Sequence, residues 1–166
     1  MDIYLVRHGA AVELDNEIAE DGYRYLNVAG RNHCKIVATK LRDLKALPDL
    51  MISSPLIRAV QTAEVFATVL RYNGEIRTAI ELVGGATFNR FLQLIKRNSH
   101  LGSLALFGHA PDVHNYSINL ARSEGKAEPR MHFHNASVCK VEYDVKSETG
   151  KFGWFLESTT MKLITE

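Results

Sequence analysis

The chain has 166 residues, of which 46% are hydrophobic, which is enough for one ordinary hydrophobic core but not for two. We therefore expect residues 1–166 to form a single domain. A formal net charge of +1 excludes the strong positive field that attracts nucleic acids or anionic membranes. No apolar run approaches the ~20 residues that span a bilayer, and the first residues lack the basic segment and cleavage site of a secretion signal. We expect a soluble protein without nucleic-acid or membrane partners.

The two cysteines, Cys34 and Cys139, lie far apart, and no Cys-x-x-Cys motif is present. A disulfide framework or a cysteine zinc site would need more cysteines at closer spacing. We interpret both as small core residues of a cytoplasmic protein.

The first half of the chain alternates strand-like and helix-like segments. Residues 2–7 (DIYLVR) are a short apolar run rich in strand formers. Residues 28–44 carry apolar side chains at helical spacing, with Asn27 as the expected N-cap. Residues 49–54 (DLMISS) predict a second buried strand.

The next helix is expected to begin at the Ser54–Pro55 dipeptide, with the serine as N-cap and the proline in the first helical position. A third strand, EIRTAIEL, is expected to end near Glu81, and a helix with phenylalanines at helical spacing follows it. Residues 103–109 (SLALFGH) predict a fourth strand, and Pro111 begins the helix after it.

The last part of the chain changes character. Residues 136–144 and 151–159 are strand-like and flank a polar KSETG turn, which predicts a β-hairpin at one edge of the sheet. The order of the elements predicts an α/β fold, namely a three-layer α/β/α sandwich with a mostly parallel central sheet.

Five residues whose side chains could bind a ligand or take part in catalysis lie at the carboxyl ends of the predicted parallel strands. Arg7 and His8 end the first strand, and Arg58 follows the second. Glu81 ends the third strand and His109 ends the fourth. Because ligands of open α/β sheets bind in the crevice outside these strand ends, we expect the five side chains to meet.

Two arginines and two histidines suit the binding and transfer of a phosphoryl group. Arginine stays charged and matches phosphate oxygens with a rigid fork of donors. A neutral histidine can attack phosphorus while a second histidine donates to the transferring oxygens. The arginines disfavour an imidazolium and so keep the nucleophilic lone pair available. A phosphate or sulfate ion is expected to bind there, and no metal or other cofactor is required.

Four motifs together resemble the histidine phosphatase superfamily, which has the phosphoglycerate mutase-like fold. They are LVRHG at 5–9, SSPLIRAVQTA at 53–63, IEL at 80–82 and GHAP at 108–111. RHG followed by SPLxRAxQTA is highly specific, and the resemblance extends from residue 3 to about residue 120. The short chain, LNVAG and FHNASVCKV most resemble the SixA-type phosphohistidine phosphatases of this superfamily.

This resemblance implies a role for each of the five residues. His8 would be the nucleophile that becomes phosphorylated, and Arg7, Arg58 and His109 would bind the phosphoryl group. Glu81, four residues before a glycine, falls where members of one branch keep a proton donor. The RHGxSxxN and WEG motifs are lacking, which speaks against a mutase or a sugar bisphosphatase.

The motif spacing leaves no room for a capping subdomain after His8 or after Glu81, so we expect a site open to a phosphate on a protein surface. The resemblance implies phosphohistidine on a histidine-containing phosphotransfer domain or a similar carrier. Imidazole departs as a neutral leaving group when its other nitrogen is protonated, so Glu81 is expected to be dispensable for this substrate and needed for esters. Two alternatives stay open: a phosphomonoesterase for sugar or nucleotide phosphates, and a non-catalytic phosphate-binding module.

Structural roles are the alternative for several residues. Arg58 could pair with a surface carboxylate, His109 could be a buried histidine with satisfied hydrogen bonds, and Glu81 could be solvated at a strand end. His132 and His134 form an HxH pair that could bind zinc or copper, but two ligands are too few without a third. We expect this pair to line the approach to the pocket or to lie on the surface.

Overall fold

The computed structural model describes residues 1–122 and 130–165. Their strands form a seven-stranded sheet in the order β3-β2-β4-β1-β5-β6-β7. β4 pairs in parallel with β1 and β2, and β2 with β3, whereas β5, β6 and β7 pair antiparallel. The strands are β1 (Asp2–Arg7), β2 (Leu50–Ser53), β3 (Ile76–Thr78), β4 (Ser103–Gly108), β5 (Val138–Asp144), β6 (Thr149–Glu157) and β7 (Lys162–Ile164).

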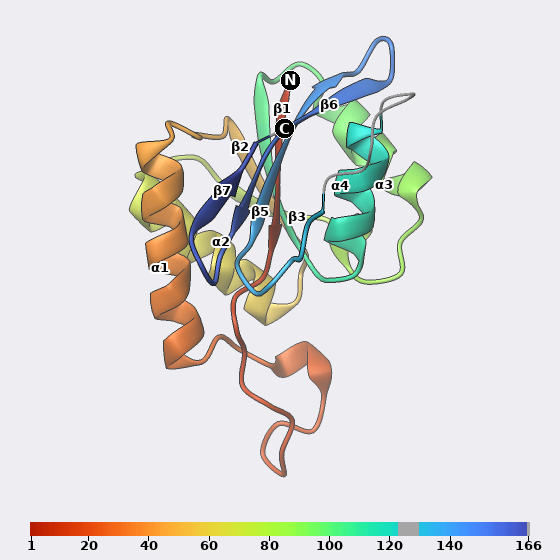
Figure 1. Ribbon diagram of the computed structural model, residues 1–166. Helices are drawn as coiled ribbons and strands as arrows, with labels where there is room; N and C mark the ends of the chain where they lie inside the picture. Colours follow the sequence, from red (N-terminus) through yellow and green to blue (C-terminus); the bar gives the residue numbers. More distant parts are fainter. Residues whose placement is uncertain (123–129, 166) are drawn as a thin grey trace.

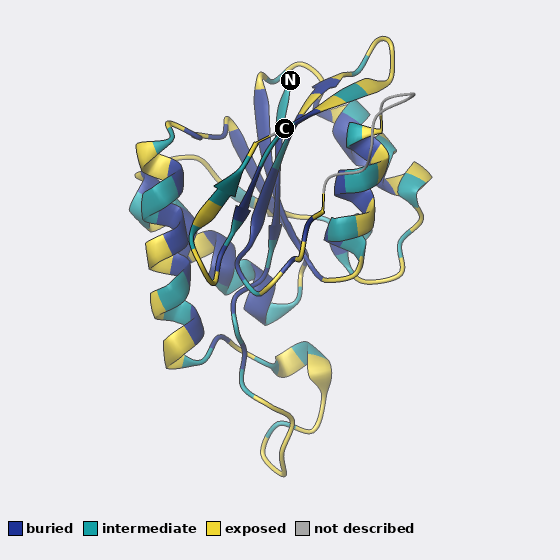
Figure 2. Ribbon diagram, viewed as in Figure 1, coloured by how far each residue is buried: buried dark blue, intermediate teal, exposed yellow. Residues whose placement is uncertain are grey.

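Helices cover both faces of the sheet, with α1 and α2 on one face and α3 and α4 on the other (Figure 1). Alternate side chains of β1 enter the two layers: Leu5 packs in the α3 and α4 layer, and Val6 in the α1 and α2 layer. The central strands are the most buried part of the fold (Figure 2). This arrangement confirms the predicted three-layer sandwich. The helices are α1 (Val28–Asp43), α2 (Ile57–Leu70), α3 (Phe88–Arg97) and α4 (Asp112–Ala121), with short 3-10 turns η1 (Asp21–Tyr23) and η2 (Ile80–Leu82).

Most of the expected elements are present where the residue patterns place them. Asn27 caps α1 because its side chain accepts a hydrogen bond from the Gly30 amide at 2.7 Å. β5 and β6 form the predicted antiparallel hairpin, and β7 adds beyond it as the edge strand. β7 was not predicted, because three residues are too few to show an alternating pattern. Among the described helices, none has the length and apolar character needed to cross a membrane.

Two predicted boundaries were wrong. The N-cap of α2 is Leu56 rather than Ser54, because the Ser54 hydroxyl contacts a histidine of β4's end instead of capping the helix. The third strand ends at Thr78, so Glu81 lies in η2 rather than at a strand end. This turn buries Leu82 in the core on the α3 and α4 side of the sheet.

Between β1 and α1 the chain forms an arm, residues 12–25, which projects beyond the carboxyl ends of the strands (Figure 1). The Val12 amide donates to the Tyr25 carbonyl at 2.9 Å, which joins the two legs of the arm at its base. The Leu26 amide donates to Gln61 Oε1 at 2.8 Å. The base of the arm is therefore fixed to α2.

Candidate active site

The parallel pairing of β1 with β4 brings two histidines together. Arg7 lies opposite Gly108 in the register of these strands, so His8 and His109 both follow the last paired residues. Their ring centroids lie 5.0 Å apart. Only 9% of His8 and 7% of His109 are exposed. The two imidazoles thus lie nearly buried, side by side, at the carboxyl edge of the sheet.

Hydrogen bonds fix the tautomer of His8. Its Nδ1 lies 2.7 Å from the Gly9 carbonyl oxygen, which can only accept, so Nδ1 carries the proton. Nε2 therefore holds the free lone pair, and the Arg58 Nε–H points toward it across 3.4 Å. Nε2 is the nitrogen of His8 that can attack phosphorus.

Arg58 lies in the first turn of α2 and is 6% exposed. Its Nη1 donates to the Asp21 carbonyl oxygen and its Nη2 donates to Asp21 Oδ2, both at 2.7 Å. These two bonds hold the guanidinium plane with its third nitrogen facing His8. The ionic partner of Arg58 is thus a residue of the arm.

A hydrogen bond to α2 fixes the backbone beside His8. The Gly9 amide donates to Thr62 Oγ1 at 2.9 Å, and the Thr62 hydroxyl donates to the Arg58 carbonyl at 2.7 Å. A Cβ atom on Gly9 would lie 2.5 Å from Cys34 Sγ, closer than the two atoms can approach. The glycine of the RHG motif therefore allows α1 to pack directly against the loop that carries His8.

Two buried nitrogens of this cluster, Arg7 Nε and His109 Nδ1, have no hydrogen-bond partner among the described residues. Arg7 is oriented by Nη1, which donates to the Phe133 carbonyl at 2.6 Å. His109 Nε2 lies 2.8 Å from Ser54 Oγ. When this hydroxyl donates to Nε2, the proton of the neutral ring stays on Nδ1. A buried donor without a partner is costly, and the oxygens of a phosphoryl group would satisfy both of them.

The environment keeps both imidazoles neutral at pH 7. The pKa of His8 is lowered to about 4, chiefly by burial and then by the positive charges of Arg58 and Arg7. The pKa of His109 is lowered to about 3, again chiefly by burial, then by its electrostatic interaction with the neighbouring His8 imidazole and by the positive charge of Arg58. The site therefore combines two uncharged imidazoles, His8 and His109, with the two cationic guanidinium groups of Arg7 and Arg58.

Glu81 lies apart from this cluster. Its Oε1 accepts a hydrogen bond from Arg97 Nη2 at 2.6 Å, and this bond lowers the pKa of Glu81. The carboxylate lines a cavity of about 520 Å³ together with Arg77 and Asn98. The structure brings four of the five candidate residues together and leaves the fifth beside the C-terminal end of α3, because η2 replaces the expected strand end.

Three supporting residues were not predicted as parts of the site. Ser54 and Thr62 lie inside the SSPLIRAVQTA motif, which was the signal that could have indicated them. Asp21 lies in the arm, outside every motif, and reaches Arg58 only because the arm folds back over the strand ends. Burial acts to raise the pKa of Asp21, but hydrogen bonds from Arg58 and Arg24 outweigh it and hold the pKa below its ordinary value. Asp21 is thus an anion that orients Arg58 rather than a proton donor.

The HxH pair lies on the surface. His132 and His134 are both exposed, and His134 Nε2 lies 3.8 Å from Glu157 Oε1. Within residues 1–122 and 130–165, no three His, Cys, Asp or Glu side chains are placed to hold a metal ion. The structure thus places the pair at one of the two locations expected for it.

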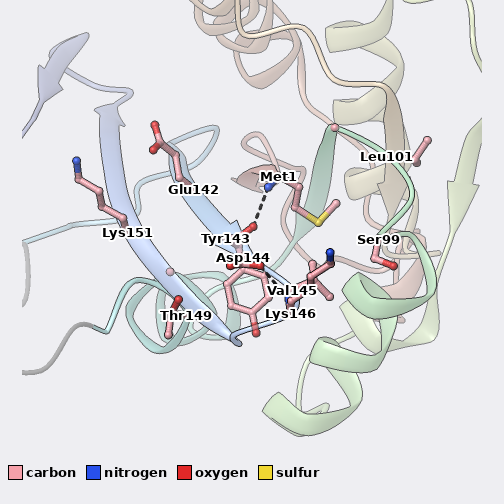
Figure 3. Close-up of a pocket in the computed structure, with 12 residues that line it drawn as sticks. Met1, Ser99, Leu101, Glu142, Tyr143, Asp144, Val145, Lys146, Thr149 and Lys151 are labelled. Atoms are coloured by element: carbon pink, nitrogen blue, oxygen red, sulfur yellow. Dashed lines mark hydrogen bonds between the residues drawn. The ribbon is translucent and has the colours of Figure 1, made fainter.

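A cavity of about 910 Å³ opens at the opposite end of the sheet (Figure 3). It lies beside the Met1 amine, which donates to the Tyr143 carbonyl at 2.7 Å. Because Met1 and His8 stand at opposite ends of β1, this cavity is separate from the histidine cluster.

Both the sequence and the fold of the chain are similar to those of known proteins. The sequence profile of the histidine phosphatase superfamily (branch 1) matches residues 3–82. An uncharacterised protein of Picosynechococcus is 32% identical over 123 residues, which are 73% of each chain. The phosphohistidine phosphatase SixA of Escherichia coli K12 is 26% identical over 166 residues and 98% of each chain. A solved structure of the protein histidine phosphatase SixA complexed with tungstate has a TM-score of 0.85 at 25% identity, covering 98% of this chain and 100% of that one.

The profile match includes the motifs that carry His8 and Arg58, and the fold likeness extends over nearly the whole chain. The chain is therefore a phosphatase that belongs to branch 1 of the histidine phosphatase superfamily, as a member of the SixA type.

Proposed function

We propose that this phosphatase removes phosphoryl groups from phosphohistidine on a protein through a covalent phospho-His8 intermediate. The observation that carries the proposal is the fixed tautomer of His8, whose Nδ1–H bonds the Gly9 carbonyl and leaves Nε2 free to attack. Arg7, Arg58 and His109 surround this nitrogen with donors for the phosphoryl oxygens.

In the first step, His8 Nε2 forms a bond to phosphorus while the bond from phosphorus to the substrate imidazole breaks. The electron pair of the broken bond goes to the substrate nitrogen, which leaves as part of a neutral imidazole when its other nitrogen carries a proton. Such a leaving group needs no strong acid. This agrees with a cluster whose nearest carboxylate, Asp21, is already held as an anion by Arg58.

In the second step, water attacks the phosphorus of phospho-His8, and the P–Nε2 bond breaks with its electron pair returning to the ring. Both water protons leave with the product as dihydrogen phosphate, and His8 regains its original tautomer. The SixA of Escherichia coli is named for phosphohistidine, and we propose the same bond for this chain. The expected carrier is a histidine-containing phosphotransfer domain or a similar protein. We further propose Arg7, Arg58 and His109 as its phosphoryl-binding residues, and a single domain without a capping subdomain as the reason that a protein can reach them.

The test is a hydrolysis assay without added metal. It compares a phosphorylated histidine-containing phosphotransfer domain with a panel of sugar and nucleotide monophosphates, using wild-type protein and the His8→Ala variant. A strong preference for the phosphorylated domain that is lost in the variant supports the proposal. A preference for one of the small esters would replace it with the phosphomonoesterase alternative. Phosphate binding without any hydrolysis that depends on His8 would replace it with a binding module.

A further inference from the structure

The arm beside the active site carries an unusual set of exposed side chains. Residues 12–25 contain five acidic residues and one arginine. The arginine, Arg24, faces the arm itself, because its Nε donates to the Val12 carbonyl at 2.6 Å and its Nη1 donates to Asp21 Oδ1 at 3.1 Å. The arm therefore presents a net negative charge to solvent. Its acidic residues are Glu13, Asp15, Glu17, Glu20 and Asp21.

The same arm exposes large apolar and aromatic side chains. Leu14 is 51% exposed, Tyr23 is 62% exposed and Tyr25 is 46% exposed. Val28, at the start of α1 just beyond the arm, is 79% exposed. Of the seven large hydrophobic side chains that are exposed among the described residues, four thus lie within residues 14–28. Exposed aromatic side chains are enriched in protein-binding surfaces, in which a polar rim surrounds the apolar part.

The arm is continuous with the histidine cluster. Asp21 forms both of its bonds to Arg58 from the arm, and Tyr23 lies two residues further along the chain. A macromolecule that delivers a phosphoryl group to His8 Nε2 must therefore pass close to the exposed acidic and aromatic side chains of the arm. A small phosphate ester would gain nothing from them and would be repelled by their charge.

From these observations we propose that the arm is the docking surface for the protein substrate, and that it recognises a carrier whose phosphorylated histidine is surrounded by basic and apolar side chains. This inference rests on the proposed function and adds the chemistry of the partner. The negative charge of the arm steers a positively charged surface toward the site, and Leu14, Tyr23 and Tyr25 pack against its apolar side chains. Glu17 and Glu20 are the most informative positions, because their exposed side chains form no ion pair with any residue that the structure describes.

The test measures binding, so that it does not depend on turnover. Two synthetic peptides each carry one non-hydrolysable phosphonate analogue of phosphohistidine, which the enzyme cannot turn over, flanked in one peptide by lysine and leucine and in its twin by glutamate and leucine. Their dissociation constants are measured by fluorescence anisotropy with the wild-type chain, with Glu17→Lys/Glu20→Lys, and with Asp43→Lys/Glu75→Lys. The last pair makes the same charge change at two exposed positions at the other end of the sheet, since Asp43 ends α1 and Glu75 precedes the first residue of β3.

We expect the wild-type chain to bind the lysine peptide at least about tenfold more tightly than its twin at low salt. The arm variant should lose this preference, the control variant should keep it, and high salt should weaken it. Equal affinity for the two peptides in the wild-type chain, or an equal loss in both variants, would overturn the docking surface. A retained preference for the lysine peptide, with no hydrolysis of either sequence when it carries phosphohistidine in place of the analogue, would overturn the proposed function while leaving the docking surface supported.

Discussion

Replacing Arg58 with lysine keeps a positive charge in the site but removes the planar guanidinium, whose nitrogens donate in three fixed directions. The guanidinium bonds Asp21 through two nitrogens at 2.7 Å each and faces His8 Nε2 with the third. A lysine ammonium is a point charge and cannot satisfy all three directions at once. The side chain is only 7% exposed, so water does not easily replace the missing bonds.

The expected loss follows from the bonds that lysine cannot make. A hydrogen bond to a charged group is worth roughly 1.5 to 3 kcal/mol. Because the Asp21 side chain is half exposed, the lower part of this range, about 1.5 to 2 kcal/mol, applies to each of the two bonds. Their loss amounts to about 3 to 4 kcal/mol, which is a decrease of roughly 100- to 1000-fold in kcat/KM. The measurement is metal-free hydrolysis of phosphoramidate, together with thermal unfolding to verify that the variant is folded. Arg42→Lys, an exposed change at the end of α1, is the matched control and should be neutral. If Arg58→Lys keeps kcat/KM within about threefold of wild type, a positive charge at this position is sufficient for activity, and the two hydrogen bonds to Asp21 are not needed.

Three further predictions concern the hydrogen bond that holds the loop beside His8, the titration of the two histidines, and the role of Glu81. Thr62→Val removes the acceptor of the buried Gly9 amide and should lower the free energy of unfolding by about 1 to 3 kcal/mol. Thr68→Val removes a hydroxyl from an exposed position of the same helix and should cost much less in the same urea titration. The pKa of an unperturbed histidine is near 6.5, as in the unfolded chain, whereas the pKa values of His8 and His109 are about 4 and 3 in the folded chain. Between these values the unfolded chain binds more protons, so the free energy of unfolding should fall as pH decreases from about 6.5 toward 4. Urea unfolding curves that do not change over this pH range would refute the neutral-imidazole site. Glu81→Gln should leave turnover of phosphohistidine within about threefold of wild type, since the carboxylate pairs with Arg97 away from the cluster; a loss approaching that of His8→Ala would restore Glu81 as the proton donor.

The meeting of His8 and His109 could be predicted from the sequence because two simple rules apply together. Apolar runs identify the buried strands β1, β2 and β4, and parallel strands end at the same edge of the sheet. The residues that follow these runs, His8 and His109, must therefore meet. Arg58 was predictable from its place in the first turn of the helix after β2.

The sequence was less informative wherever a side chain has a partner far away along the chain. Glu81 appeared to end a strand, but burial of Leu82 in the core favours a 3-10 turn that directs the carboxylate to Arg97. The pairing of Asp21 with Arg58 joins residues 37 positions apart, across an arm without regular periodicity. Ser54 has the residue type of a helix cap, and only the position of His109 on the neighbouring strand shows that it binds an imidazole instead.

The central claim is that His8 Nε2 carries the phosphoryl group during turnover. The most direct test mixes the wild-type chain with phosphoramidate, stops the reaction within one turnover at alkaline pH, where phosphohistidine is stable, and locates the phosphoryl group by peptide mass spectrometry. We expect one acid-labile phosphoryl group on His8 in the wild-type chain and none in His8→Gln, which should also show no turnover. Turnover without any phosphoryl group on His8, or hydrolysis by His8→Gln at the wild-type rate, would contradict it.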